Sequence, residues 1–189
     1  SHHSACTDSR VPRFQIGAGG PRSYPNITVP GACTAVTRRT NMRKAFLAPW
    51  DPQVGIIHLY AVAGAQEKTG VEVHLITKVV DHHHSTVTPR EDNLPLFNAE
   101  VHRDTAKGIN NLLSKNKYDE PGSVFDGRQP HYMRLLDAEA AMAQLVYQRV
   151  NCVAAGLVER PEHMPDDTFD FSMWKRGKLV VPKPDVYFI

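Results

Sequence analysis

Two histidines separated by one residue are the sharpest chemical feature of this chain. They are His82 and His84, in the run Asp-His-His-His at 81–84. If this segment is a strand, alternate side chains share a face, so the two imidazoles point the same way. Two imidazoles on one face can bind a divalent metal ion side by side. The alternative for such a pair is a polar surface strand or turn without a metal.

A tyrosine and an asparagine near the end of the chain form a second candidate pair. Tyr147 and Asn151 are four residues apart in a segment with helical character. That spacing places both side chains on one helical face, one turn apart. The pattern alone does not distinguish a chemical role for the tyrosine from a half-buried position in the core.

Strands and helices alternate around these residues in the order β-α-β-β-α-β-α. Asp51 and Asp137 are suited to cap helices, and Gly70 and Gly156 to end them. The alternation of apolar residues and the β-branched content predict the strands. The expected strands are 33–40, 71–80, 82–88 and 131–136, and the expected helices are 52–68, 94–114 and 138–156.

This order predicts an α+β fold, a ferredoxin-like (RRM-like) sandwich. Its antiparallel β-sheet carries helices on one face, and a C-terminal catalytic helix is added. We expect a loose, Gly- and Pro-rich N-terminal arm at 1–32, a domain at 33–160 and a C-terminal tail at 161–189.

The composition permits a nucleic-acid partner without demanding one. The formal net charge is +2, and the basic residues cluster, as at Arg38 and Arg39 and again at Arg103 and Lys107. The three cysteines have no metal-type spacing, and their odd number argues against a disulfide framework, which favours a reducing compartment. We find no apolar run long enough for a membrane span and no signal peptide, so a cytoplasmic location is expected.

Two stretches together resemble REP-associated tyrosine transposases, which are single-tyrosine transposases of the HUH type and similar to the IS200 group. VVDHHHSTVTPREDNLPLF resembles their HUH segment, and LVYQRVNCVAAGLVERPEHMP resembles their tyrosine signature. TRRTNMRKAFLAP, followed by a helix and VEVHLIT, also fits the opening of the family. The resemblance covers roughly residues 22–165. In the second stretch the residues in register are Tyr147, Asn151, Val153, Gly156, Leu157, Val158, Pro161 and Glu162.

The resemblance implies a role for each candidate residue. Tyr147 would be the nucleophile. His82, His84 and the side-chain oxygen of Asn151 would bind Mg²⁺ or Mn²⁺. A free tyrosine, with a pKa of about 10, is a poor nucleophile at neutral pH. A nearby cation would favour the phenolate and polarise the scissile phosphate.

The implied function is DNA transposition by a single-stranded DNA endonuclease and ligase. Transesterification would leave a 5′-phosphotyrosine link and a free 3′-OH that can rejoin the strand. The expected partner is single-stranded or hairpin DNA, and the family includes both monomers and domain-swapped homodimers. Backbone phosphates could be bound by four basic residues, Arg38, Arg39, Arg103 and Lys107.

Three residues depart from the family pattern. His83 and Ser85 stand where apolar, core-facing residues are usual, so we expect this strand to pack poorly, and Cys152 stands where proline is usual. A decayed or domesticated DNA-hairpin-binding module is therefore an alternative. Another is a hydrolytic metallonuclease that uses water as the nucleophile. A third possibility is a different metal arrangement that includes His83 or His74.

Overall fold

The computed structural model describes residues 28–118, 122–165, 174 and 177–188. Its four strands and three α-helices follow the expected order. The strands are β1 (Thr34–Arg39), β2 (Glu72–Lys78), β3 (His82–Thr88) and β4 (His131–Arg134). The α-helices are α1 (Pro52–Thr69), α2 (Leu94–Lys115) and α3 (Ala138–Ala154), and short 3-10 turns lie at Asn41–Arg43, Pro161–His163 and Asp185–Phe188.

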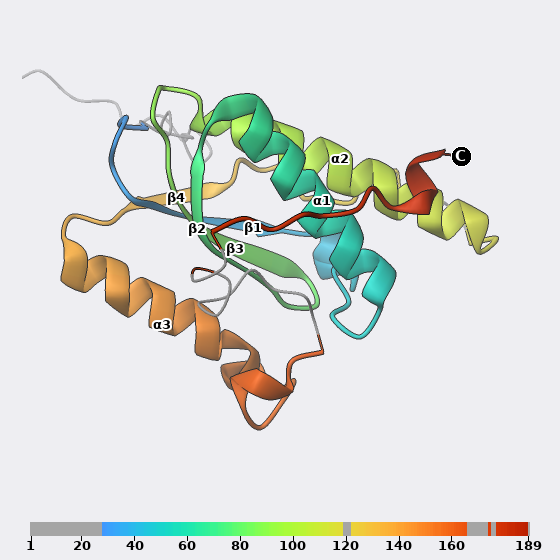
Figure 1. Ribbon diagram of the computed structural model, residues 1–189. Helices are drawn as coiled ribbons and strands as arrows, with labels where there is room; N and C mark the ends of the chain where they lie inside the picture. The colour runs from blue at the N-terminus through green and yellow to red at the C-terminus, as the bar shows by residue number, and fades with distance from the viewer. Residues whose placement is uncertain (1–27, 119–121, 166–173, 175–176, 189) are drawn as a thin grey trace, which may run out of the picture.

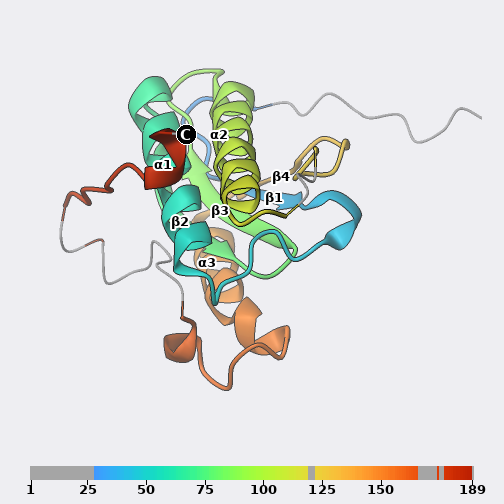
Figure 2. The ribbon, with the colours of Figure 1, turned by 90° about the vertical axis from the view of Figure 1, so that its right-hand side faces the viewer.

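The four strands form one antiparallel sheet in the order β2-β3-β1-β4. Helices α1 and α2 lie side by side on one face of the sheet, and α3 lies on the opposite face (Figures 1 and 2). This arrangement confirms the expected ferredoxin-like α+β sandwich with an additional C-terminal helix.

Local sequence sets the ends of the helices that position the site. The Asp51 carboxylate accepts a hydrogen bond from the Gln53 amide at 2.9 Å, and α1 begins with Pro52. Asp137 caps α3 in the same way, accepting from the Ala140 amide at 2.7 Å. Gly70 ends α1 with a φ of 68°, a left-handed conformation that glycine adopts without strain.

The two faces of β3 have different partners. Thr86 faces α3, where its hydroxyl accepts a hydrogen bond from Gln148 Nε2 at 2.8 Å. Because side chains alternate, His82 and His84 share that face. Val87 faces α1 and α2 and is fully buried in the main apolar cluster with Phe97. His83 and Ser85 share the face of Val87 and therefore point into the core.

A cluster of buried histidines occupies the core behind His83. His83 is 1% exposed, and its Nε2 lies 3.1 Å from His102 Nε2 of α2. Its ring also packs edge-on against His58 of α1 and against Phe125. His58 Nδ1 lies 3.2 Å from the Thr105 hydroxyl. The strand that we expected to pack poorly is thus buried from His83 to Val87. His102 of α2 supplies a hydrogen-bond partner for His83 and His58 of α1 a ring contact, whereas the Ser85 hydroxyl has no hydrogen-bond partner among the described residues.

This cluster predicts a loss of stability in acid. Burial, followed by repulsion from Lys78 and His102, lowers the pKa of His58 to about 3. Burial likewise holds the pKa of both His83 and His102 well below the ordinary value. The unfolded chain protonates these rings near pH 6.5 and the folded chain does not, so protonation favours unfolding as the pH falls below 6.5.

We expect His58 alone to remove about 2 kcal/mol from the free energy of unfolding between pH 6.5 and 5, and His83 and His102 to act in the same direction. Urea unfolding at a series of pH values measures this slope. In the variant His58→Gln, which cannot titrate, the slope should decrease by about 1.4 kcal/mol per pH unit. Equal slopes for the parent and the variant would show that His58 is already protonated in the folded chain.

Segments beyond the predicted domain contact it at both ends. The expected arm lies outside the described residues except for 28–32, where the Gly31 amide donates to the Pro89 carbonyl at 2.7 Å. Within the expected tail, Val186 is 1% exposed, and its carbonyl accepts from Asn111 Nδ2 at 2.8 Å. The Tyr187 hydroxyl donates to the Asp104 carbonyl. Val186 and Tyr187 of the expected tail therefore pack on α2.

Candidate active site

The two histidines of the His-x-His pair lie together on the α3 side of the sheet. Their ring centroids are 4.8 Å apart. His84 is buried, at 6% exposed, whereas the side chain of His82 is about one-quarter exposed. Regular alternation along β3 places both imidazoles on one face, as the spacing predicted.

Helix α3 brings Tyr147 and Asn151 to the same place. The Asn151 amide Nδ2 lies 3.4 Å from His82 Nε2, and the Tyr147 ring centroid lies 5.9 Å from that of His84. Asn151 is 9% exposed and Tyr147 is 51% exposed. The hydrogen bond from Gln148 to Thr86 fixes this face of α3 against β3. Four residues from two distant segments of the chain thus converge at one edge of α3.

Both imidazoles present a nitrogen that can act as a ligand. Burial, with smaller contributions from His82 and Arg39, lowers the pKa of His84 to about 4, so its ring is neutral at pH 7. His84 Nε2 is buried and has no hydrogen-bond partner in the described structure. A neutral imidazole with a free nitrogen is the form that binds metal ions.

The donor set fits a divalent cation with open coordination positions. Two imidazole nitrogens and a carboxamide oxygen would leave the remaining positions to water and phosphate oxygen. For the oxygen of Asn151 to face the histidines, its amide must turn so that Oδ1 replaces Nδ2. In the described part of the chain, no three His, Cys, Asp or Glu side chains are arranged to hold a metal ion. His83 faces the core, and His74 bonds the Thr88 hydroxyl at 2.8 Å.

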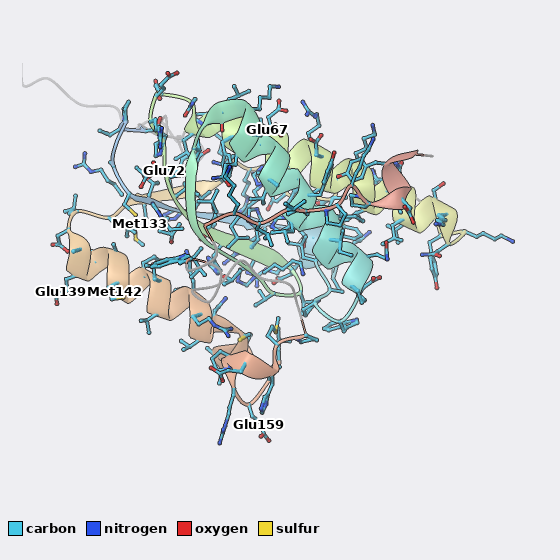
Figure 3. All side chains as sticks on the ribbon, in the orientation of Figure 1. Glu67, Glu72, Met133, Glu139, Met142 and Glu159 are labelled. Atoms are coloured by element: carbon cyan, nitrogen blue, oxygen red, sulfur yellow. The ribbon has the colours of Figure 1, made fainter. Side chains whose placement is uncertain are left out.

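A cavity of about 500 Å³ adjoins the tyrosine and His84. Its floor is the part of the sheet formed by β1 and β4, where Met133 lies on the side that faces α3 (Figure 3). Its rim carries positive and polar side chains. The residues that line it are Ala35, Thr37, Arg38, Arg39, His84, Asp126, Arg128, Gln129, His131, Met133, Gln144 and Tyr147.

The structure separates the four basic residues proposed to bind DNA. Arg39 pairs in register with His82, so it shares the face of the site, and it lines the cavity. Arg38 also lines the cavity but donates to the Asp126 carbonyl, and its guanidinium lies 6.0 Å from the Phe125 ring centroid. Arg103 and Lys107 belong to α2, on the opposite face of the sheet. Arg103 forms ion pairs with Glu100 and Asp104.

Several residues of the site carried no signal that we recognised in the sequence. Arg128 and His131 come from the loop before β4 and from its first residue. Thr37 of β1 and Asp81 of the turn before β3 contact the two histidines directly. The adjacency of Asp81 to His82 was visible in the sequence, but the others require knowledge of which strands are neighbours.

None of the helices in the described part of the chain combines the length and apolarity that crossing a membrane requires.

Comparisons with known proteins show which fold the chain shares. No protein-family model matches the chain, and no curated protein matches its sequence. A solved REP-associated tyrosine transposase, bound to a REP hairpin, aligns over 86% of this chain and 92% of its own, with a TM-score of 0.62 and 15% identity. A candidate transposase from Deinococcus radiodurans R1 aligns over 74% of this chain and 97% of its own, with a TM-score of 0.45 and 16% identity.

The first of these similarities confirms at the level of the fold the resemblance found in the two sequence motifs. This chain therefore has the fold of a REP-associated tyrosine transposase and resembles that family in both its motifs and its architecture.

Proposed function

We propose that this chain is a transposase that cuts and rejoins single-stranded DNA through a covalent link to Tyr147. The observation that carries the proposal is the convergence of the Tyr147 ring, His82, His84 and the Asn151 amide beside a cavity with a positive rim. Similarity to a hairpin-bound REP-associated tyrosine transposase supports hairpin-bearing DNA as the substrate.

The chemistry is an exchange of phosphodiester bonds. The Tyr147 oxygen attacks the scissile phosphorus and loses its proton to solvent, while the bond from phosphorus to the 3′ oxygen breaks. The 3′ oxygen takes up a proton, so that a free 3′-OH and a 5′-phosphotyrosine link result. Attack by a 3′-OH on that link reverses the exchange, rejoins the strand and returns the proton to Tyr147.

We assign His82, His84 and Asn151 as the residues that hold Mg²⁺ or Mn²⁺. When bound, such a cation neutralises charge on the phosphate and makes the tyrosine a better nucleophile. We further assign phosphate binding to the arginines at the cavity rim, Arg39 and Arg128. The half-exposed Tyr147 ring leaves its phenol accessible to a strand lying over β1 and β4.

A single experiment separates this proposal from its alternatives. The chain is incubated with Mn²⁺ and labelled hairpin oligonucleotides whose single-stranded flanks are randomised, and the products are resolved on a denaturing protein gel. We expect a labelled band at the mass of the chain plus one DNA fragment. Cleavage without such a band would indicate a hydrolytic metallonuclease. Retention of the hairpin on the native protein without cleavage would indicate a binding module.

A further inference from the structure

Each of the two candidate metal-binding histidines is held by a neighbouring side chain at Nδ1. Asp81 Oδ1 lies 2.7 Å from His82 Nδ1, and the Thr37 hydroxyl lies 2.9 Å from His84 Nδ1. Both contacts engage the ring nitrogen that is not directed toward α3. The other nitrogen, Nε2, is therefore left on both rings for the site.

The contact with Asp81 determines which nitrogen of His82 carries the proton. An ionised carboxylate only accepts hydrogen bonds, so His82 Nδ1 must donate. In the neutral ring, Nε2 then has a lone pair. The Asn151 amide lies 3.4 Å from His82 Nε2, so this nitrogen faces α3 and the site.

Thr37 acts on His84 in the corresponding way. When the Thr37 hydroxyl accepts from His84 Nδ1–H, the lone pair of His84 also lies on Nε2. His84 Nε2 is buried and has no hydrogen-bond partner among the described residues, which is costly unless a ligand binds there. Asp81 in the turn before β3 and Thr37 of β1 thus engage the Nδ1 atoms of the two rings, which leaves both Nε2 atoms to the site.

A hydrogen-bonded turn carries the Asp81 carboxylate. The Asp81 carbonyl accepts two hydrogen bonds from Thr40, from its amide at 2.8 Å and from its hydroxyl at 3.0 Å. Thr40 is 1% exposed. The Val79 amide donates to the His82 carbonyl at 2.9 Å and closes the turn between β2 and β3. The backbone on both sides of the carboxylate is therefore held, and removal of the side chain leaves these bonds in place.

We propose that Asp81 and Thr37 are positioning residues that fix the tautomer and orientation of His82 and His84 so that both Nε2 atoms face a bound metal ion. The proposal rests on the metal-binding role assigned above. Partners of this kind orient metal-binding histidines, and their loss typically lowers metal affinity by about 10–100-fold.

The tautomer can be measured without any metal. Nitrogen-15 NMR of the histidine rings, with the chain in a chelating agent at pH 8, distinguishes a protonated Nδ1 from a protonated Nε2. We expect His82 to be protonated at Nδ1 in the parent and in Asp81→Asn, whose amide oxygen still accepts the bond. In Asp81→Ala we expect the proton to populate Nε2. A parent ring protonated at Nε2, or no change in Asp81→Ala, would overturn the proposal for Asp81.

The expected effect on metal affinity is tested by Mn²⁺ binding in the absence of DNA. Binding is followed by the loss of the electron-spin resonance signal of the free ion. We expect Asp81→Ala and Thr37→Val each to weaken binding by about 10–100-fold, and the matched Asp81→Asn and Thr37→Ser to stay within a few-fold of the parent. Equal affinity in all five proteins would overturn the positioning role and leave the metal site standing. A parent that binds no Mn²⁺ would overturn the metal site itself, while the NMR result still decides whether Asp81 sets the tautomer.

Discussion

We expect replacement of Tyr147 by phenylalanine to abolish the covalent protein–DNA adduct and to lower strand cleavage by at least about a thousandfold. The change removes only the phenol oxygen, which is the atom that would bond to phosphorus. No other hydroxyl of α3 stands near His84 in the described structure, since the residues that line the cavity from this helix are Gln144 and Tyr147. Binding of hairpin DNA should persist, because the positive rim is unchanged.

The variant should fold like the parent, since Tyr147 is 51% exposed. Tyr118→Phe is the matched control, because Tyr118 is a 68% exposed tyrosine that follows α2, whereas the site faces α3. The measurement is the yield of adduct and of cleaved strand under single-turnover conditions with Mn²⁺. Adduct formation by Tyr147→Phe would require another nucleophile, and normal cleavage without an adduct would favour attack by water.

The elements around the site were predictable because each has a local cause. The β-branched, partly alternating run at 71–80 corresponds to β2 at Glu72–Lys78. The capping residues Asp51 and Asp137 mark the starts of α1 and α3. The pairing of Tyr147 with Asn151 on one helical face also follows from helical periodicity alone. These features depend on neighbours in the sequence, so the sequence contains them directly.

The composition of the cavity depends on strand order, which local patterns do not specify. Because β4 pairs with β1, residues near 128–133 come to lie beside Arg39 and Tyr147. The adjacent Arg38 and Arg39 illustrate the same point, since in the sequence they form one basic cluster. In the sheet they extend from opposite faces, and only Arg39 shares the face of His82.

The fate of His83 could not be predicted for a related reason. A histidine in a core position looks like a defect when its strand is considered alone. Its partners His58 and His102 lie on two different helices and have no relation to it in sequence spacing. The three histidines come into contact only when the two helices pack on the sheet. His83 thus packs in the core on the side of the sheet opposite to Tyr147. One face of β3 contributes to the core, and the other contributes His82 and His84 to the candidate site.

Replacement of His82 by alanine should reduce cleavage and adduct formation by at least about a hundredfold and leave the fold intact. His82 supplies one of the two imidazole nitrogens. Without it only two ligands remain, His84 and Asn151, and two ligands are too few to hold a divalent cation tightly. The side chain is about one-quarter exposed, and its described side-chain hydrogen bonds are those to Asp81 and Asn151. The core behind β3, where His83 packs, is not touched by the change.

His74→Ala is the control that separates the loss of a ligand from the loss of any nearby histidine. His74 lies on the neighbouring strand β2 and bonds the Thr88 hydroxyl at 2.8 Å, at the end of β3 remote from His82. We expect it to keep the parent's activity and Mn²⁺ affinity. Circular dichroism and urea unfolding of both variants test the fold. Collapse of His82→Ala would make that histidine structural, and loss of activity in His74→Ala would favour a metal arrangement that includes His74. Retained activity in His82→Ala would overturn the assignment of His82 as a ligand, and His131, which lines the same cavity, would then be the next imidazole to replace.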